Sequence, residues 1–380
     1  MKFRCERDDL LDAVQFALRA ISNRATLPVL SGMRIEARGN GTVDVAATDL
    51  ELTMQTALQA GVDEPGRVVV PGRLFGEIIR NLGAGAVSFA SSEGELELGS
   101  GRGQFRVKSL VSDDYPALPI EGVDDDGGAT TIEMDKAVLH TALGQATRSA
   151  SSDESRQILT GVLWEIDSTR LTLAATDSYR LSVCDLEVAG GPGEVTKVVL
   201  PARALGELGR ALQGASGTIR AVLKENLVTF FLPSAGNDGS GAGESVIATR
   251  LIEGEFPNYR RLLPEGYPNV LTVGRETLLD VVRRVGLLAQ NNLPVKLRLG
   301  NELEVSAHTP DVGEAQEVID ADYSGEAFVI AFNPQFLTDG VSAIRTEKIV
   351  LEAGDGLKPA IIHGEDDPSL TYLLMPVRLS

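Results

Sequence analysis

The chain has 380 residues, 43% of them hydrophobic and 23% charged, values typical of soluble globular proteins that exclude a largely disordered or fibrous chain. This length exceeds what one compact core usually organises, so we expect two or three domains. With 54 acidic and 35 basic side chains the formal net charge is -19, which argues against a protein that holds nucleic acid through bulk electrostatic attraction.

The spacing of apolar residues predicts the elements of the first third of the chain. Apolar residues within 10–21 share one helical stripe, and residues 33–54 alternate between apolar and polar side chains as half-buried strands do. A second helical stripe runs from Leu74 to Leu82, and residues 87–107 alternate again. The predicted order is helix, strands, helix, strands.

The same order recurs in the rest of the chain. Helical stripes lie at 139–146 and 205–212, and again at 278–285 and 336–341, with alternating segments between them. Six helices laid on antiparallel sheet predict an α+β fold.

Short motifs recur at intervals of about 130 residues and indicate three tandem units. The Ala-Ala-Thr-Asp motif at 46–49 returns at 174–177, with a weaker third copy at 305–309. We therefore expect domains over 1–124, 125–256 and 257–380.

Two stretches are predicted to be irregular. Residues 121–130 are acidic and glycine-rich, as an exposed linker is, and residues 235–244 resemble a flexible hairpin loop within the second domain.

No constellation of catalytic or metal-binding residues is evident. His140, His308 and His363 are isolated and lack the spacing of metal ligands. The glycines of residues 99–103 are not followed by the helix that a phosphate loop needs, so we expect a hairpin turn there. The sequence predicts a protein without enzymatic activity, metal or cofactor.

The repeated Thr-Asp pair is predicted to be structural. Asp49 and Asp177 occur at equivalent points of two repeats. This recurrence favours a turn in which the aspartate accepts hydrogen bonds from its own backbone, rather than a pair of catalytic carboxylates.

The chain is predicted to be cytoplasmic. Charged residues within 1–9 interrupt the apolar stretch that a secretion signal requires, and no apolar run is long enough to cross a bilayer. Cys5 and Cys184 offer no framework of disulfide bonds, as in a reducing compartment.

Tandem units can form an open array that binds proteins, or they can close into a ring. A ring around DNA is retained by its topology, so weak contacts with phosphates suffice and local charge matters more than net charge. Four of the six predicted helices carry one more basic than acidic side chain. The arginines that we predict to face DNA from these helices are Arg73, Arg80, Arg148, Arg203, Arg210 and Arg283.

Four segments carry a resemblance to a known family. They are Arg24–Leu30, Ala174–Leu181, Phe256–Arg261 and Tyr372–Leu379. With them the chain resembles, from Met1 to Leu379, the bacterial DNA polymerase III beta subunit, the sliding clamp. The resemblance implies three clamp domains per chain and a head-to-tail homodimer, a ring with pseudo-sixfold symmetry whose helices line the hole.

The resemblance also implies the function and the partners. It implies a processivity factor that encircles double-stranded DNA without sequence preference, associated with the nucleoid. Its implied partners are the DNA polymerase III alpha subunit, the clamp loader, and other polymerases and repair proteins that carry short hydrophobic motifs. Arg24 matches a family contact with DNA, whereas Asp153 replaces a neutral polar residue that contacts DNA elsewhere.

A peptide-binding pocket between the second and third domains is implied in the same way. The matching residues are Leu159, Thr176, Tyr179, Arg180, Leu181, Pro257, Arg261, Leu262, Asn333, Phe336, Leu357, Pro359, Met375, Pro376, Val377, Arg378 and Leu379. Adaptable apolar side chains rimmed by arginine suit varied peptides. Ser178 and Tyr179 depart from the family, which often has a glycine and a smaller polar residue there. In the alternative interpretation, residues 375–377 form a final core strand.

Phe105 and Val107 alternate on a predicted edge strand. Because an unpaired apolar edge needs a cover, we expect both at the dimer interface. The rival functional hypothesis is a monomeric repeat scaffold for protein–protein interaction that does not encircle DNA, and a hydrolytic or carbohydrate-active enzyme is a more distant one.

Overall fold

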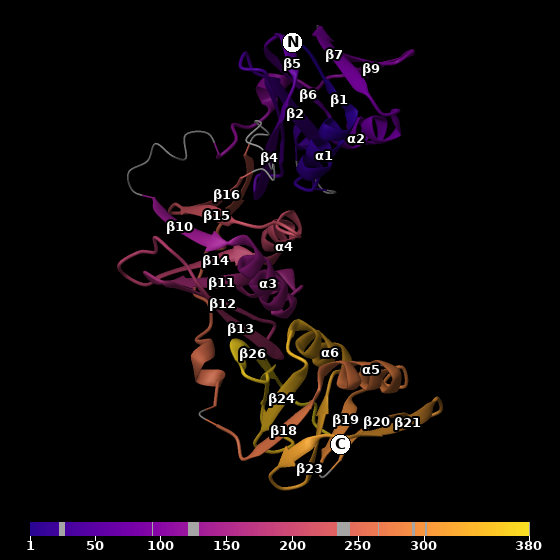
Figure 1. The fold of residues 1–380 in the computed structure, drawn as a ribbon, viewed down its shortest axis with the longest axis vertical. Coiled ribbons are helices and arrows are strands. Elements are labelled where there is room, and N and C mark those ends of the chain that lie inside the picture. The colour runs from indigo at the N-terminus through magenta and orange to yellow at the C-terminus, as the bar shows by residue number, and fades with distance from the viewer. Residues whose placement is uncertain are drawn as a thin grey trace. The chain divides into compact units, whose positions relative to one another are not determined.

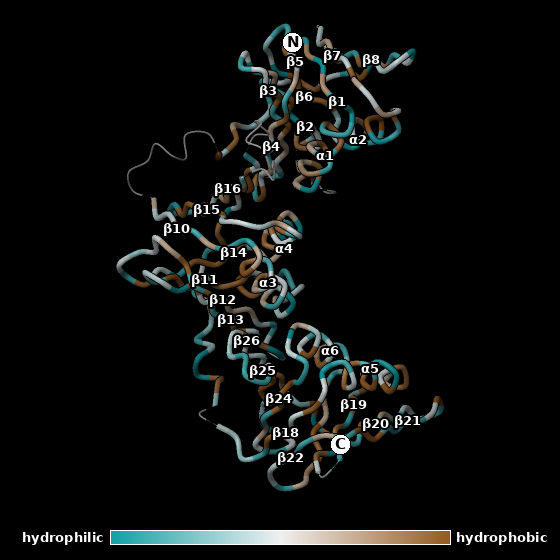
Figure 2. Tube along the Cα trace, in the orientation of Figure 1, coloured by the Kyte–Doolittle hydropathy of each residue, from teal (hydrophilic) through white to brown (hydrophobic). Residues whose placement is uncertain are grey.

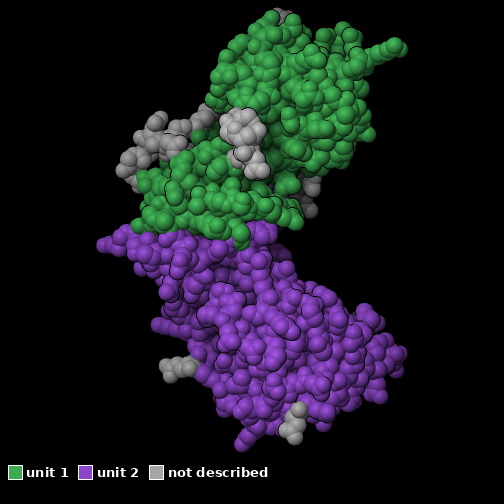
Figure 3. Space-filling model, viewed as in Figure 1, with its two compact units in different colours: residues 1–137, 189–191, 210–251 green, residues 138–188, 192–209, 252–380 purple. Residues whose placement is uncertain are grey.

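The computed structural model describes residues 1–22, 27–92, 94–120, 129–233, 244–264, 266–290, 293–300 and 302–379. They form two compact units (Figures 1 and 3). Unit 1 comprises residues 1–137, 189–191 and 210–251, and unit 2 comprises residues 138–188, 192–209 and 252–380. The division runs through the predicted second domain, whose strands are shared between the two units.

Unit 1 contains two antiparallel sheets. The order of the first is β5 (Gly61–Glu64), β1 (Lys2–Glu6), β7 (Ala86–Ser92), β8 (Glu95–Ser100), β9 (Gly103–Lys108). The order of the second is β10 (Thr130–Asp135), β15 (Thr218–Leu223), β16 (Leu227–Leu232), β17 (Ser245–Arg250), β4 (Leu52–Gln59), β3 (Thr42–Thr48), β2 (Gly32–Ala37), β6 (Gly66–Pro71). The pairing of β17 with β4 joins strands of the first and second predicted domains into one sheet.

Two helices pack together in unit 1. Helix α1 (Arg7–Leu18) contacts β3 and β4, and α2 (Gly72–Asn81) contacts β2 and β6. A Cβ atom on Gly76 would lie 2.6 Å from the end of the Leu18 side chain, so a larger residue there would have to displace that side chain. Leu74 was expected in the apolar stripe but is 50% exposed, because Gly72, Phe75, Gly76 and Ile79 form the buried face of α2.

The alternation of residues 33–54 predicts half-buried strands. In the structure these strands are buried more fully than that. Even Arg34 and Asp44 are buried, at 3% and 4% exposure. The reason is a second cover: Tyr115 and Leu118 pack against Ala46 on one face, while α1 contacts β3 and β4. Figure 2 shows the hydrophobic stretches that run along these strands.

Unit 2 also contains two antiparallel sheets. The order of the larger is β14 (Thr196–Pro201), β11 (Gly161–Ile166), β12 (Arg170–Thr176), β13 (Arg180–Glu187), β26 (Asp367–Leu374), β25 (Ala360–Gly364), β24 (Lys348–Ala353), β18 (Asn269–Gly274), β22 (Asp322–Ser324). The order of the smaller is β21 (Gly313–Ile319), β20 (Leu303–Thr309), β19 (Val295–Leu299), β23 (Phe328–Phe332). The pairing of β13 with β26 joins the second and third predicted domains.

The helices of unit 2 lie on one side of its larger sheet (Figure 1). They are α5 (Arg275–Gly286), α6 (Pro334–Ala343), and most of α3 (Lys136–Ala146) and α4 (Ala202–Ala211), whose residues 136–137 and 210–211 fall in unit 1. Helix α6 packs on α5, β25 and β26, and the Gln145 amide of α3 donates a hydrogen bond to the Ala343 carbonyl at 3.0 Å. With α1 and α2, these are the six α-helices of the described residues, as the sequence predicts.

Short 3₁₀ turns complete the helical elements. They are Pro28–Ser31, Ser112–Asp114, Thr147–Ser149, Glu154–Thr160 and Tyr259–Leu262.

The two Thr-Asp turns have the predicted form. Asp49 Oδ1 accepts hydrogen bonds from the backbone N–H groups of Glu51 and Leu52, and Asp177 Oδ1 accepts from those of Tyr179 and Arg180. The prediction that these aspartates bond their own backbone is confirmed.

The other predicted irregular segments have different outcomes. The glycines of residues 99–103 join β8 to β9 in a hairpin, with Gly101 at φ 56°, as predicted. Most of the predicted linker and hairpin loop, residues 121–128 and 234–243, lies outside the described residues.

Candidate functional site

The predicted pocket residues all belong to unit 2, and several of them lie where β13 pairs with β26. Leu181 pairs with Leu373 across the two strands. The chain then leaves β26 at Leu374, and the Met375 N–H donates a hydrogen bond to the Tyr179 carbonyl at 2.9 Å. Segments almost two hundred residues apart in sequence are thus brought together.

The last residues of the chain do not continue the strand. The Val377 N–H donates to the Ala331 carbonyl at 2.7 Å, and the Met375 and Leu379 side chains are 39% and 45% exposed. The alternative interpretation of residues 375–377 as a final core strand is therefore wrong. Pro376 is half-buried and Arg378 is exposed on the same segment.

Several of the predicted pocket residues are buried and support the exposed ones. Leu159 and Leu181 lie in one core cluster with Leu373 and Tyr259. The Thr176 hydroxyl donates to the Arg180 carbonyl at 2.7 Å and stabilises the turn that carries Tyr179.

Other predicted residues are large apolar side chains left exposed. Tyr179 is 61% exposed, Leu262 is 53% exposed and Leu357 is 71% exposed. The loop of Leu357 and Pro359 is ordered by Asp355, whose carboxylate accepts the N–H groups of Leu357 and Lys358. These side chains leave apolar surface open to solvent.

Arg180 is held between two carboxylates and an aromatic ring. Its Nε donates to Asp177 at 3.0 Å, its Nη1 donates to Asp339 at 2.5 Å, and its guanidinium carbon lies 4.3 Å from the centre of the Phe336 ring. Burial alone would lower the pKa of Arg180, but the hydrogen bond to Asp339 and the neighbouring Tyr372 raise it above its usual value. The cation is therefore permanent and fixed in direction.

Helix α6 places Phe336. The Asn333 side chain caps the helix by accepting the N–H groups of Gln335 and Phe336. The Phe336 ring stacks with Tyr179, with the ring centres 6.4 Å apart. The Tyr372 hydroxyl donates to the Phe336 carbonyl at 2.8 Å, and burial raises the pKa of that phenol well above its usual range.

Sequence reasoning missed the residues that orient this site. Asp339 binds Arg180 and has no motif of its own, whereas Tyr372, which binds Phe336, begins the segment Tyr372–Leu379 that carries the resemblance but was not assigned to the pocket. Asp177 belongs to the repeated Thr-Asp pair, so the repeat marked it, but only as a turn residue. The spacing of Asp339, one helical turn after Phe336, was the one available signal.

The arginines predicted to face DNA are exposed on their helices, as that role requires. Arg73 and Arg80 lie on α2, Arg203 and Arg210 on α4, and Arg283 on α5. Their contact with DNA stays a prediction.

Three further residues were considered for the DNA-facing surface, and the structure describes two of them. Arg148 follows α3, and its Nη1 donates to the Ser342 hydroxyl of α6 at 3.0 Å. Asp153 pairs with Arg156 at 3.1 Å, and hydrogen bonds from Ser155 hold the pKa of its carboxyl below the usual value. Arg24 lies outside the described residues.

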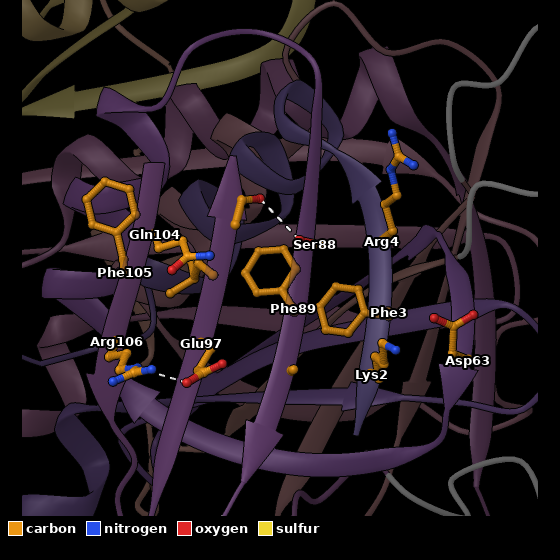
Figure 4. A pocket seen from close by; sticks show the side chains of 13 residues that line it. Lys2, Phe3, Arg4, Asp63, Ser88, Phe89, Glu97, Gln104, Phe105 and Arg106 are labelled. Carbon is orange, nitrogen blue, oxygen red and sulfur yellow. Dashed lines mark hydrogen bonds and ion pairs between the residues drawn. The ribbon is translucent and has the colours of Figure 1, made fainter. Parts of the chain in front are cut away.

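Strand β9 is an edge of the first sheet of unit 1. Figure 4 shows Phe105 at this edge, beside a hollow of about 260 Å³ that is also lined by Phe3 and Phe89. Phe105 is 39% exposed, whereas Val107 is 3% exposed. Val107 packs inside its own domain, so Phe105 is the member of the predicted pair that the edge presents at the surface.

Comparisons with known proteins decide the family. Models of the DNA polymerase III beta subunit match the chain in three consecutive stretches: the N-terminal domain over residues 1–119, the central domain over 133–258 and the C-terminal domain over 260–378. The chain belongs to the beta sliding clamp family. The predicted three tandem clamp domains are confirmed by these matches.

Similar proteins from bacteria agree with this chain over its full length. The beta sliding clamp of Staphylococcus epidermidis is 32% identical, over 100% of this chain and 99% of that protein. The DNA polymerase sliding clamp of Bacillus subtilis superimposes with a TM-score of 0.91 at 27% identity, and a sliding clamp of Pseudomonas aeruginosa bound to griselimycin with 0.90 at 26%, each over 100% of both chains.

The described residues contain no candidate membrane span and no candidate metal site. None of the helices there is long and apolar enough to cross a membrane. Those same residues contain no group of three His, Cys, Asp or Glu side chains placed to hold a metal ion.

Proposed function

We propose that this chain is a DNA sliding clamp, a non-catalytic processivity factor of the DNA polymerase III holoenzyme. Two copies join head to tail, so that six domains enclose duplex DNA, and an ATP-driven clamp loader opens and places the ring. The observation that carries this proposal is the run of three beta-subunit domains that spans the chain. The full-length similarity to solved sliding clamps supports it.

Enclosure accounts for DNA binding by a chain with a net charge of -19. Arg73, Arg80, Arg203 and Arg283 are exposed on helices and supply local positive charge. Contacts with phosphates that carry no base information permit sliding on any sequence. Confinement, rather than affinity, keeps the ring on DNA, and we propose a cytoplasmic location at the nucleoid.

The pocket of unit 2 would take short hydrophobic peptide motifs from the DNA polymerase III alpha subunit, the clamp loader, and other polymerases and repair proteins. Exposed Tyr179, Leu262 and Met375 offer apolar area for such a peptide. Exposed Arg261 supplies a charge at the rim for its polar groups, while Arg180, paired with Asp177 and Asp339, orders the site beside Phe336. The borders 1–124, 125–256 and 257–380 are proposed for the three domains, and the matched family domains support them.

Two edge strands have the charges that a head-to-tail dimer needs. Strand β9 carries Lys108, beside an Arg106 that is paired with Glu97, and β21, an edge of the smaller sheet of unit 2, carries Glu314, beside a Glu317 that is paired with Arg284. Edge strands of opposite charge can extend each other's sheets, with Phe105 covered at the junction. We propose that β9 of one subunit pairs with β21 of the other.

Charge reversal tests the dimer and hence the ring. Native mass measurement at nanomolar concentration should give twice 40.4 kDa for the unchanged chain. Lys108→Glu and Glu314→Lys should each raise the dimer dissociation constant by about tenfold, since like charges then face each other, and the double variant should recover most of the loss.

The rival hypothesis, a monomeric repeat scaffold, predicts a single-chain mass at every concentration. That result for the unchanged protein would overturn the ring. A dimer that neither reversal weakens would retain the ring but reject the pairing of β9 with β21.

A further inference from the structure

A carboxylate outside the predicted pocket binds the turn that forms one of its walls. Glu165 lies on β11 with its side chain 13% exposed. Its Oε2 accepts a hydrogen bond from Arg260 Nη1 at 2.6 Å and another from the Tyr259 hydroxyl at 3.3 Å. Its Oε1 lies 3.5 Å from Lys197 Nζ, on the strand that pairs beside it.

The two residues that Glu165 binds begin the 3₁₀ turn Tyr259–Leu262, in the segment that connects the central and C-terminal domains. Tyr259 is 3% exposed and packs with Leu159 and Leu181 of the predicted pocket. The Arg260 guanidinium covers the Tyr259 ring, 4.9 Å from its centre. The first half of the turn is therefore anchored to the sheet of the central domain by a core side chain and by an ion pair.

The second half of the same turn consists of pocket residues. Arg261 is exposed, and Leu262 is 53% exposed. In a 3₁₀ turn successive side chains point about 120° apart, so fixing the directions of residues 259 and 260 also fixes those of 261 and 262. Without the anchor, both side chains would have to be ordered when a peptide binds, at a cost in affinity.

The charges favour a permanent anchor at neutral pH. Burial alone would raise the pKa of Glu165, but the hydrogen bond and charge of Arg260, and then Lys197, lower it below its usual value. Burial raises the pKa of Tyr259 to about 12, so that the phenol keeps the proton it donates. The other nearby carboxylate, Asp185, accepts a hydrogen bond from the Thr172 hydroxyl at 2.5 Å.

We propose that Glu165 is a positioning residue of the peptide-binding pocket: it binds Tyr259 and Arg260 and so presents Arg261 and Leu262 to the incoming peptide. This inference rests on the proposed pocket. It concerns a residue that would not touch the peptide itself.

Binding of griselimycin, the compound bound in the structure of a Pseudomonas aeruginosa relative, provides the first measurement. Glu165→Ala in the full-length dimer should weaken binding about tenfold, and Glu165→Gln, which keeps one acceptor, about threefold. The matched control is Asp44→Ala, which removes a buried strand carboxylate paired with Arg38 in unit 1 and should leave binding unchanged.

A double-mutant cycle separates positioning from general destabilisation. Arg261→Ala should weaken binding in the unchanged protein but have a much smaller effect in the Glu165→Ala background, because the turn is already released. Additive losses would show that Glu165 acts independently of the turn and would overturn the proposal.

Trypsin cleavage supplies a readout that needs no ligand, because Arg260 and Arg261 are both cleavage sites. Glu165→Ala should speed cleavage after these two residues at least fivefold, with cleavage elsewhere unchanged. An unchanged rate there would contradict the anchor. If griselimycin fails to bind the unchanged protein, the proposed pocket fails instead, and the trypsin result still decides whether Glu165 anchors the turn.

Discussion

Leu50 and Ser178 occupy equivalent positions in the two Thr-Asp turns and share an uncommon backbone conformation. Their φ angles are 80° and 82°, in the left-handed region that side chains with a Cβ atom disfavour. Ser178 has a compensating contact, because its hydroxyl accepts a hydrogen bond from Arg156 Nη1 at 3.0 Å. No such side-chain bond is available to Leu50, whose side chain is apolar and 41% exposed.

We therefore predict that Leu50→Gly stabilises the protein by about 1 kcal/mol, since glycine adopts positive φ without a steric cost. Ser178→Gly should change stability less, because relief of strain is offset by loss of the bond to Arg156. The measurement is the midpoint of urea unfolding. A control, Leu50→Ala, keeps the Cβ atom and should give no gain; a gain as large as that of glycine would refute the backbone explanation.

For single residues, the sequence predicted the roles of those that belong to local or repeated patterns. It missed the roles of those whose partners are distant in the chain. The turn role of Asp49 and Asp177 followed from their recurrence. Glu165 binds a residue 95 positions away, and Asp339 binds one 159 positions away. Glu165 has no neighbour in sequence that indicates its contact, and the spacing of Asp339 from Phe336 places it on the same helix face without indicating Arg180, so the fold reveals both contacts.

Helix α6 connects several parts of the site and packs closely on the sheet. A Cβ atom on Gly340 would lie 2.2 Å from the Tyr372 ring, which also donates its hydroxyl hydrogen bond to the Phe336 carbonyl. A larger residue at this position must displace the helix and, with it, Phe336 and Asp339.

Gly340→Ala is accordingly expected to destabilise the protein by about 2 kcal/mol and to weaken peptide binding. Gly206→Ala on α4 is the matched control, because no atom lies within 4 Å of its Cβ position. There the higher helix propensity of alanine should stabilise by about 0.5 to 1 kcal/mol. Thermal unfolding of both variants checks the pair, and equal effects would contradict the packing of α6 on β26.

The helices and strands could be predicted because their apolar periods are local, but burial could not. The alternation of residues 33–54 correctly indicated strands, yet Tyr115 and Leu118, far along the chain, cover the face that was expected to meet solvent. The burial of α2 could not be predicted either. Gly72 and Gly76 lie on the face of α2 that packs inward, so Leu74, on another face, is exposed.

For the whole molecule, the sequence repeat predicted three domains but not how their sheets join. β17 pairs with β4, and β13 pairs with β26, so that strands of neighbouring domains form continuous sheets. Edge-to-edge pairing depends on backbone groups that all residues share, which is why no side-chain pattern indicated it. These joints connect neighbouring domains through the backbone hydrogen bonds of a shared sheet.

Ring closure also resolves the conflict between a net charge of -19 and a function on DNA. An open binder with this charge would dissociate readily, because phosphate contacts must overcome overall repulsion. An enclosing ring dissociates from a circle only when it opens.

Retention on DNA before and after linearisation tests this claim most directly. The protein is placed by its clamp loader on a nicked circular duplex and separated from free protein by gel filtration, and the DNA is then cut once with a restriction enzyme. We predict that the protein stays with the circle and slides off the linear product. Equal retention on both forms, or equal loss from both, would contradict enclosure.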